Sequence, residues 1–297
     1  MLSVVIITFR RLDALRRTLT ALHPQGGGDG RGVGDHTPDS RVCCPLPPGS
    51  EIIVADNASC DGTLDMLTRE FPHVRVVALD ANLGVEAFNR AAALARGDVL
   101  LILDDDAIPD GSSLLAALNL LAREPPMAAV ALHPVHAATG VSEWPFAKAA
   151  RGGWPVMGCG NLIRTDAWKR VGGYEGAFFL YRNDVDLALK LLGAGLDVWF
   201  DPAWVVRHDS PPGVKSDRWL RLATRNWVWL ARRHGRGMWM WLGASAGVLW
   251  ALRHAGWRPT RWGCVLAGAR DGLTARPPTA GVRGGQGWRE LLRLRTP

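Results

Sequence analysis

Three consecutive carboxylates, Asp104, Asp105 and Asp106, follow directly on the apolar run at residues 99–103. Because adjacent acids repel one another, the segment favours a positively charged partner. Mg²⁺ and Mn²⁺ take oxygen ligands and are commonly held by one or two carboxylates together with the phosphates of a substrate. An acidic turn that closes a strand would produce the same residues. The chemistry therefore depends on what the rest of the chain brings near these acids.

The acids follow the last of four short apolar, β-branched runs, which predict the strands of an α/β fold with a mostly parallel sheet. These runs lie at residues 4–8, 52–55, 74–79 and 99–103. Helices are expected between them: at residues 12–22, from an N-cap at Asp61 through Leu67, and from Glu86 to Arg96 with Gly97 as the stop. Residues 25–50 are rich in Gly, Pro and polar side chains, which predicts a mobile loop insertion.

Polar side chains follow these runs, at the carboxyl ends of the predicted strands. They are Thr8 to Arg11, Asp56 with Asn57, Asn82 to Gly84, and Asp104 to Asp106. In an open α/β sheet, ligands bind outside this edge. We therefore expect the four groups to converge on one binding site.

The second half of the chain adds two candidate site residues, Asp184 and His208. Before them we expect a helix at residues 113–123, a strand at 128–135, a glycine-bearing segment at 158–164, and a short helix capped by Thr165 and ended by Gly172 and Gly173. Asp184 lies in the first turn of a helix that starts near Asn183, where a carboxylate is often only a cap or a dipole partner. His208 follows predicted strands at residues 198–200 and 203–206, where a lone histidine is more often structural than a metal ligand.

Positive charge is concentrated at the end of the chain. The 297 residues carry a net charge of +7, but residues 216–297 hold 15 Arg, no Lys and three acids, which gives +12 there and −5 on the first 215 residues. The same tail holds nine of the 14 Trp. A mixture of Arg, Trp and Leu suits a membrane interface better than nucleic acid, so no nucleic-acid partner is expected. A packed helical subdomain with Arg-rich outer faces is the alternative. The chain is thus divided into a domain at 1–215 and a helical region at 216–297.

The cysteines and the N-terminus indicate a cytoplasmic protein. The five cysteines are an odd number without CxxC spacing, which indicates neither a disulfide framework nor a zinc site. Residues 1–8 are too short for a signal peptide and are followed by Arg10 and Arg11, so we expect a buried first strand. Residues 237–252 are apolar, but fall short of the roughly 20 residues that span a bilayer. They are expected to lie in the interface at the inner face of the cell membrane, or else to be buried within the protein.

As an ordered set, these segments resemble family 2 glycosyltransferases of the GT-A fold, and specifically the bacterial rhamnosyltransferase-like branch. The resemblance covers about the first 210 residues. Its signposts are residues 3–11, residues 53–59 with Asp61 to Thr63, Asn82 to Gly84 with Asn89, residues 103–107, Gly172 to Tyr174, residues 183–187 and residues 206–208.

The resemblance implies an inverting transfer from a UDP-, GDP- or dTDP-sugar to a saccharide or lipid-linked acceptor in surface polysaccharide synthesis. Asp104, Asp106 and His208 would hold Mg²⁺ or Mn²⁺, and Asp184 would be the general base. The implied donor contacts are Thr8, Phe9, Arg11, Asp56, Asn82, Gly84, Asn89, Asp104 and Asp105. Three departures from the family pattern are Phe9 where Tyr is common, residues 85–88 in place of a glycine-rich run, and Asn183 in place of the usual first acid.

Two other functions remain open at this point. Sugar-phosphate nucleotidyltransferases usually carry a glycine-rich basic loop after the first strand, whereas residues 8–13 contain no glycine. A non-catalytic membrane or nucleic-acid adaptor would explain the Arg/Trp tail but not the convergent acids. Metal-dependent binding of a nucleoside diphosphate separates the transferase from the adaptor.

Overall fold

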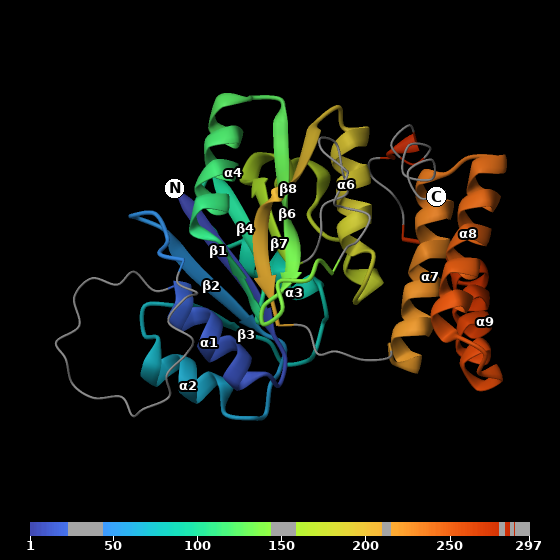
Figure 1. The fold of residues 1–297 in the computed structure, drawn as a ribbon, viewed down its shortest axis with the longest axis horizontal. Helices are drawn as coiled ribbons and strands as arrows, with labels where there is room; N and C mark the ends of the chain where they lie inside the picture. Colours follow the sequence, from blue (N-terminus) through green and yellow to red (C-terminus); the bar gives the residue numbers. More distant parts are fainter. Residues whose placement is uncertain (23–43, 144–158, 210–214, 279–282, 286–287, 289–297) are drawn as a thin grey trace.

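The computed structural model describes residues 1–22, 44–143, 159–209, 215–278, 283–285 and 288. It consists of a sheet layered between helices, with three further helices, α7 to α9, stacked beside it (Figure 1). The sheet part contains the candidate site, so its construction is described first.

The sheet has eight strands in the order β3-β2-β1-β4-β7-β6-β8-β5. The strands are β1 (Leu2–Thr8), β2 (Glu51–Asp56), β3 (Arg75–Ala78), β4 (Val99–Asp104), β5 (Ala107–Pro109), β6 (Met127–His136), β7 (Gly160–Arg164) and β8 (Asp197–His208). Only β5 and β7 run opposite to the other strands of this sheet. The predicted α/β class with a mostly parallel sheet is therefore confirmed.

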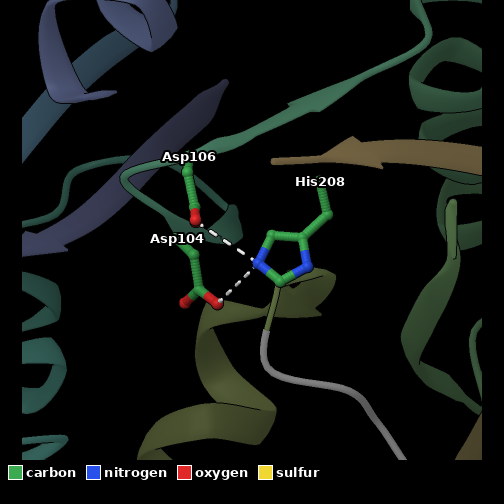
Figure 2. Close-up of side chains that lie close together, drawn as sticks. All are labelled: Asp104, Asp106 and His208. Atoms are coloured by element: carbon green, nitrogen blue, oxygen red, sulfur yellow. Dashed lines mark ion pairs between the residues drawn. The ribbon is translucent and has the colours of Figure 1, made fainter. Parts of the chain in front are cut away.

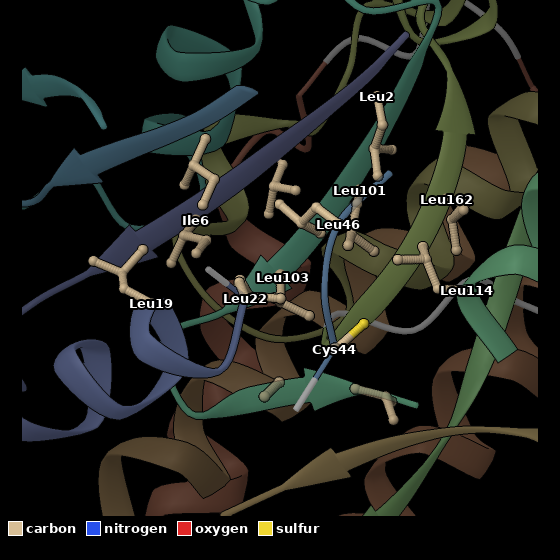
Figure 3. Packing of buried hydrophobic residues seen from close by; sticks show 14 of the residues in the cluster. Leu2, Ile6, Leu19, Leu22, Cys44, Leu46, Leu101, Leu103, Leu114 and Leu162 are labelled. Carbon is tan, nitrogen blue, oxygen red and sulfur yellow. The ribbon is translucent and has the colours of Figure 1, made fainter. Parts of the chain in front are cut away.

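Helices cover both faces of the sheet because the strand residues alternate between two apolar cores. One core packs β1 residues Val4 and Ile6 against α1 (Leu12–Leu22), α2 (Thr63–Glu70) and α4 (Gly111–Arg123), as Figure 3 shows in part. The other packs Val5 against α3 (Glu86–Ala92), α5 (Thr165–Val171) and α6 (Asn183–Gly193). The central strands are thus buried on both faces, which is why they appear in the sequence as continuous apolar runs.

Several predicted details were wrong. Asp61 is not the N-cap of α2, which is Gly62; instead the Asp61 carboxylate accepts hydrogen bonds from the Thr63 hydroxyl and the Leu12 N–H. Helix α3 ends at Ala92 rather than Arg96. Thr165 is the first residue of α5 rather than its cap, and its hydroxyl donates to the Gly97 carbonyl.

The two short strands predicted at residues 198–200 and 203–206 are one irregular strand, β8, whose pairing with β6 shifts register near Ala131. The glycine-bearing segment is strand β7, inserted antiparallel between β4 and β6. Of the predicted loop insertion at 25–50, residues 25–43 lie outside the described residues.

The C-terminal region is helical, as predicted, with α7 (Asp217–His234), α8 (Met238–Ala255) and α9 (Pro259–Thr274) packed against one another. Three of its nine Trp side chains, those of Trp227, Trp229 and Trp288, are buried. Helix α8 approaches them through Gly243 and Gly247, where an added Cβ would overlap Trp288 and Trp227 respectively. No helix among the described residues is long and apolar enough to cross a membrane. The boundary near residue 215 stays a prediction.

Candidate functional site

The predicted polar groups meet at one edge of the sheet. Strand pairing sets Thr8 beside Asp56 and Ile7 beside Asp104 at the carboxyl ends of β1, β2 and β4. His208 ends β8 and pairs with Ala107, which directly follows the acids. Residues more than 90 positions apart in the sequence are therefore neighbours because parallel strands end together.

Asp104, Asp106 and His208 form a cluster with the composition of a metal site. One ligand atom from each residue lies within 4.8 Å of the other two. His208 Nε2 lies 3.3 Å from Asp106 Oδ1 and 3.9 Å from Asp104 Oδ2. Figure 2 marks both contacts with dashed lines. Asp106 Oδ1 is buried and makes no hydrogen bond of good geometry. A buried carboxylate oxygen without a hydrogen bond, facing an imidazole nitrogen and a second carboxylate, fits a divalent cation such as Mn²⁺ or Mg²⁺.

Glu143 orients the histidine of this cluster. Its carboxylate lies 2.8 Å from His208 Nδ1, so the neutral ring carries its hydrogen on Nδ1 and presents the Nε2 lone pair to Asp104 and Asp106. A carboxylate behind a metal-binding histidine is a common second-layer arrangement. The backbone brings Glu143 there because its N–H donates to the Pro134 carbonyl of β6. Nothing in the sequence around residue 143 indicated this role.

Arg11 and Thr8 contact three other carboxylate oxygens of the acid run. Arg11 donates to Asp106 Oδ2 at 2.6 Å and lies 3.4 Å from Asp105 Oδ1, while the Thr8 hydroxyl donates to Asp105 Oδ2. Asp105 is buried, and Thr18 fixes its backbone carbonyl. Asp105 thus points back into the protein, whereas Asp104 and Asp106 point toward His208.

The cluster carries more negative than positive charge. Burial raises the pKa of Asp104 to about 7 and that of Asp105 to about 6, and the neighbouring Asp106 adds to both shifts. Burial would also raise the pKa of Asp106, but His208 and Arg11 outweigh it and hold that pKa below its ordinary value. Burial opposes protonation of His208, yet its three acidic neighbours raise its pKa to about 10. Asp104, Asp105 and His208 therefore hold protons more readily than free side chains do, and a divalent cation bound to the cluster would displace such protons.

The predicted donor contacts lie along the same edge. Asp56 is buried; its Oδ2 accepts from the Ser59 N–H, and its Oδ1 has no hydrogen bond. Asn82 caps the Gly84 N–H. Gly84 adopts φ +59°, and an added Cβ would overlap the Phe179 carbonyl, so this position needs glycine. Phe9 is 37% exposed at the end of β1.

Asn89 differs from the other predicted donor contacts because protein groups occupy its side chain. Its amide donates to Glu86 and to the Tyr174 carbonyl, and its oxygen accepts from the Tyr174 N–H. Asn89 therefore ties α3 to the segment after α5. A direct contact of Asn89 with a donor stays a prediction.

Asp184 lies in the first turn of α6, as predicted. Helix α6 precedes β8, so its first turn lies at the carboxyl edge of the sheet. After burial, Asp184 and Asp104 are the main causes that raise the pKa of the Tyr174 hydroxyl, so both carboxylates lie near that ring. A second acid near this edge, Glu143, is engaged with His208.

The backbone that leads to Asp184 is strained and is held from α7. Phe179, Tyr181 and Arg182 all have positive φ, between 65° and 70°. Such conformations are costly for residues with a Cβ and persist only where surrounding contacts fix them. The fully buried Asn226 of α7 donates to the carbonyls of Phe178, Leu180 and Tyr181 at 2.7–3.0 Å. This role of Asn226 could not be predicted from the sequence, because an Asn within a helix carries no distinguishing pattern.

Asp186 is not part of the open site. Its fully buried carboxylate accepts hydrogen bonds from Arg233 and His234, each at 2.8 Å, and Lys190 Nζ lies 3.7 Å away. Two aspartates in one helical turn thus have different surroundings: Asp184 is partly exposed at the edge of the sheet, and Asp186 is enclosed against α7.

Residues 3–188 match the family described as Glycosyl transferase family 2. An N-acetylglucosaminyl-diphospho-decaprenol L-rhamnosyltransferase of Mycobacterium tuberculosis is 28% identical over an alignment of 251 residues, which covers 68% of this chain and 79% of the relative. The succinoglycan biosynthesis protein ExoA of Rhizobium meliloti is 25% identical over 284 residues, covering 73% of this chain and 86% of that protein.

Solved structures confirm the predicted GT-A fold. The mannosyltransferase PcManGT of Pyrobaculum calidifontis, in complex with GDP-Man and Mn²⁺, superposes with a TM-score of 0.60 at 19% identity, covering 92% of this chain and 87% of that one. GalNAc-T7 with UDP, GalNAc and Mn²⁺ superposes with a TM-score of 0.52 at 16% identity, covering 75% of this chain and 48% of that one.

Proposed function

Because the chain belongs to glycosyl transferase family 2, we propose that it is a metal-dependent inverting enzyme that moves a sugar from a nucleoside-diphosphate sugar to an acceptor hydroxyl. The observation that carries this proposal is the Asp104, Asp106 and His208 cluster at the carboxyl edge of the sheet, with Asp184 at the same edge. The two relatives named above support a role in cell-surface polysaccharide or glycolipid synthesis.

The donor would bind across the ends of β1, β2 and β4. Asp56 Oδ1, buried and without a hydrogen bond, is suited to accept from the ribose or base of the nucleotide. Asp104, Asp106 and His208 would hold Mn²⁺ or Mg²⁺ beside the donor's diphosphate. When bound there, the cation would neutralise the charge that develops on the departing nucleoside diphosphate.

Asp184 is proposed as the general base. An acceptor hydroxyl is a poor nucleophile until a carboxylate takes its proton, and the first turn of a helix favours the charged form of an acid. With the base on one face of the sugar and the leaving group on the other, a single displacement inverts the anomeric centre. Asn226 would hold the strained loop that sets the direction of Asp184.

The acceptor is proposed to be lipid-linked, as it is for the mycobacterial relative by its name. Helices α8 and α9 support this with an exposed apolar face made of Met238, Trp241, Leu242, Leu249, Trp262, Leu266 and Leu273. Arg253, Arg258 and Arg270 are exposed on the same two helices and their connection, where Asp271 is the one acid and is paired with Arg221. This combination suits an anionic lipid surface.

A thermal-shift screen tests the donor proposal. UDP-, GDP- and dTDP-sugars are added with Mn²⁺ or with EDTA, since a ligand that binds only the folded state raises the melting temperature. We expect one nucleotide class to raise it in Mn²⁺ and to lose that effect in EDTA. Stabilisation that is unchanged by EDTA, or produced by no nucleotide sugar, would contradict the proposal.

Replacement of Asp184 tests the base. Asp184→Asn keeps the size of the side chain but removes the basic oxygen, so transfer should fall on the order of 10² to 10⁴-fold while donor affinity and the melting temperature persist. Asp186→Asn is the matched control one helical half-turn away, and should cost more stability than turnover. Near-normal transfer by the Asp184 variant would refute the assignment.

Liposome flotation tests the membrane proposal. The protein should float with anionic vesicles at low salt and be released as salt screens the arginines. The double replacement of Trp241 and Leu249 by Ser should weaken flotation, whereas Leu115→Ser, at a 54% exposed leucine of α4, should not. A parent protein that stays in the soluble fraction would exclude this surface.

A further inference from the structure

A basic pocket lies between α7, α9 and the loop that leads to Asp184. Its volume is about 450 Å³, and it is lined by Phe179, Arg218, Arg221, Leu222, Arg225 and Asp271. Arg221 and Arg225 lie three and seven residues after Arg218 along α7, so all three arginines lie on one face of the helix. None of them belongs to the metal cluster or to the predicted donor contacts.

The pocket lies toward the same edge of the molecule as Asp104, Asp106 and His208. Helix α7 follows β8, which ends at that edge with His208, and Arg218 and Arg221 are in its first turns. In Figure 1 the first turns of α6 and α7 both lie at the end of the molecule where β8 stops. Phe179 links the pocket to the site directly, because its carbonyl accepts from the Val85 N–H beside Gly84 at 2.7 Å.

The described residues that line the pocket include three arginines but only one carboxylate, that of Asp271. Arg221 is paired with Asp271 at 2.7 Å, and Arg225 donates to the Phe178 carbonyl at 2.9 Å. Arg218 lies over the Phe179 ring at 5.1 Å, and no carboxylate of the described residues is within ion-pair distance of it. Burial lowers the pKa of Arg225; Asp271 opposes this, but Arg221 adds to it. Three guanidinium groups thus share one carboxylate, which leaves room for an anion with two charges.

We propose that this pocket binds the diphosphate group of a prenyl-diphosphate-linked acceptor. The inference rests on the proposed function, because it assigns the anionic part of the lipid-linked acceptor. Guanidinium groups hold phosphate oxygens through paired N–H donors, and Arg218 and Arg221 are the exposed ones. Phe179 and Leu222 supply apolar surface for the first prenyl unit. The diphosphate of the donor is assigned to the metal cluster, so the two diphosphates have separate partners.

Titration calorimetry in EDTA tests the pocket apart from the donor site. Farnesyl diphosphate is the probe, and farnesol and inorganic diphosphate are its two halves. The full-length protein should bind farnesyl diphosphate at least tenfold more tightly than either half. Equal binding of farnesol would assign the contact to apolar surface alone, and equal binding of inorganic diphosphate would assign it to a free anion. Either result would overturn the proposal.

Two substitutions should act in opposite directions. Arg218→Gln should weaken farnesyl diphosphate binding about tenfold or more, since it removes charge-assisted hydrogen bonds. Asp271→Asn should strengthen binding, because it removes the internal carboxylate that competes for Arg221. Arg123→Gln, at an exposed arginine in the last turn of α4, outside the pocket and the apolar face of α8 and α9, is the control and should change nothing. Equal affinities for the parent and the Arg218 variant would refute the assignment.

The donor assay separates this proposal from the proposed function. Mn²⁺-dependent binding of the nucleotide should be the same in the parent and in Arg218→Gln, while the acceptor KM of the variant rises and kcat is kept. Loss of nucleotide binding in the variant would place Arg218 in the donor site and overturn the inference. If the parent bound no nucleotide sugar, the proposed function would fail, and the EDTA titration would still decide whether the pocket takes a lipid diphosphate.

Discussion

Two aspartate clusters, one at the strand ends and one between α6 and α7, differ in how their charge is balanced. In the open cluster, Asp104, Asp105, Asp106 and Glu143 face two cationic side chains among the described residues, Arg11 and His208. In the closed cluster, Asp186 and Glu175 face Arg233, Lys190 and His234. Among the described residues, the acids of the first cluster outnumber its cations, whereas the acids of the second are matched by Arg233 and Lys190.

The histidines of the two clusters differ in the same way. His234 Nδ1 accepts from the Gly284 N–H at 3.0 Å, so its Nε2 carries the hydrogen and donates it to Asp186. His208 Nδ1 faces Glu143 instead, so the Nε2 of the neutral ring carries a lone pair. The partner of one ring nitrogen decides the role of the other. We therefore expect His208, whose Nδ1 is held by an acceptor, to be able to bind a metal through Nε2, and His234, whose Nδ1 is held by a donor, not to be.

The largest expected effect is on the open cluster. Asp106→Ala removes the buried oxygen that faces His208 and should abolish Mn²⁺-dependent binding of a nucleoside diphosphate, measured by titration calorimetry. His208→Ala should weaken that binding. Asp186→Asn is the control from the closed cluster and should bind as the parent does. Retention of binding by both open-cluster variants would place the metal elsewhere.

The next effect concerns stability and belongs to the closed cluster. Asp186→Ala leaves Arg233 and Lys190 buried without their carboxylate, which should lower the free energy of unfolding by about 3–5 kcal/mol in urea titrations. Asp104→Asn should cost far less in EDTA, because it removes one of three neighbouring like charges. A similar loss in both variants would show that the two clusters do not differ as described.

The pH dependence of the closed cluster follows from the same contacts. Burial alone would raise the pKa of Asp186, but the hydrogen bond from His234 and the charges of Arg233 and Lys190 hold it below its ordinary value. The unfolded chain therefore takes up this proton at a higher pH than the folded one. Stability from Asp186 is present above about pH 4 and is lost as the pH falls toward the folded pKa. In urea titrations repeated across this pH range, the free energy of unfolding of Asp186→Asn should fall less steeply with decreasing pH than that of the parent.

The sequence predicted the open cluster well because it depends on strand ends. The apolar runs fixed where β1, β2 and β4 stop, and the topology of a parallel sheet then brought Thr8, Asp56 and Asp104 together. Asp184 could be placed in a first helical turn for the same kind of local reason. Glu143 could not be predicted, since it reaches His208 through a backbone return beside β6 that leaves no periodic pattern.

The C-terminal region was harder to interpret because composition does not show which side chains face solvent and which face the interior. Its arginines and tryptophans suggested a membrane-binding surface. However, Arg233 is buried against Asp186, and Trp227 is buried against α8. Asn226 likewise gains its role only because α7 lies against strained backbone at 178–182. Long-range contacts of single helical residues are set by tertiary packing, which a single sequence does not display.

The smallest expected effect separates the metal ligands from the residue that orients them. Glu143→Gln keeps a side chain of the same size that can still accept from His208 Nδ1, so the ring should stay in place, but the negative charge behind it is lost. Such second-layer changes typically cost 10- to 100-fold in metal affinity. We expect a loss within that range for Mn²⁺, measured by calorimetry, with the melting temperature of the metal-free protein kept.

Glu143→Ala extends this test, because it also removes the hydrogen-bond acceptor of His208 Nδ1. The neutral ring can then carry its hydrogen on Nε2 instead. It should lose more Mn²⁺ affinity than Glu143→Gln, yet less than Asp106→Ala. In the closed cluster the corresponding change, Glu175→Gln, should leave Mn²⁺ binding unchanged, since Glu175 lies 3.4 Å from Arg233 rather than behind a ligand. Mn²⁺ affinity that is the same in the parent and in both Glu143 variants would show that His208 does not bind the metal through Nε2, and the contrast between the two histidines would then have no consequence for function.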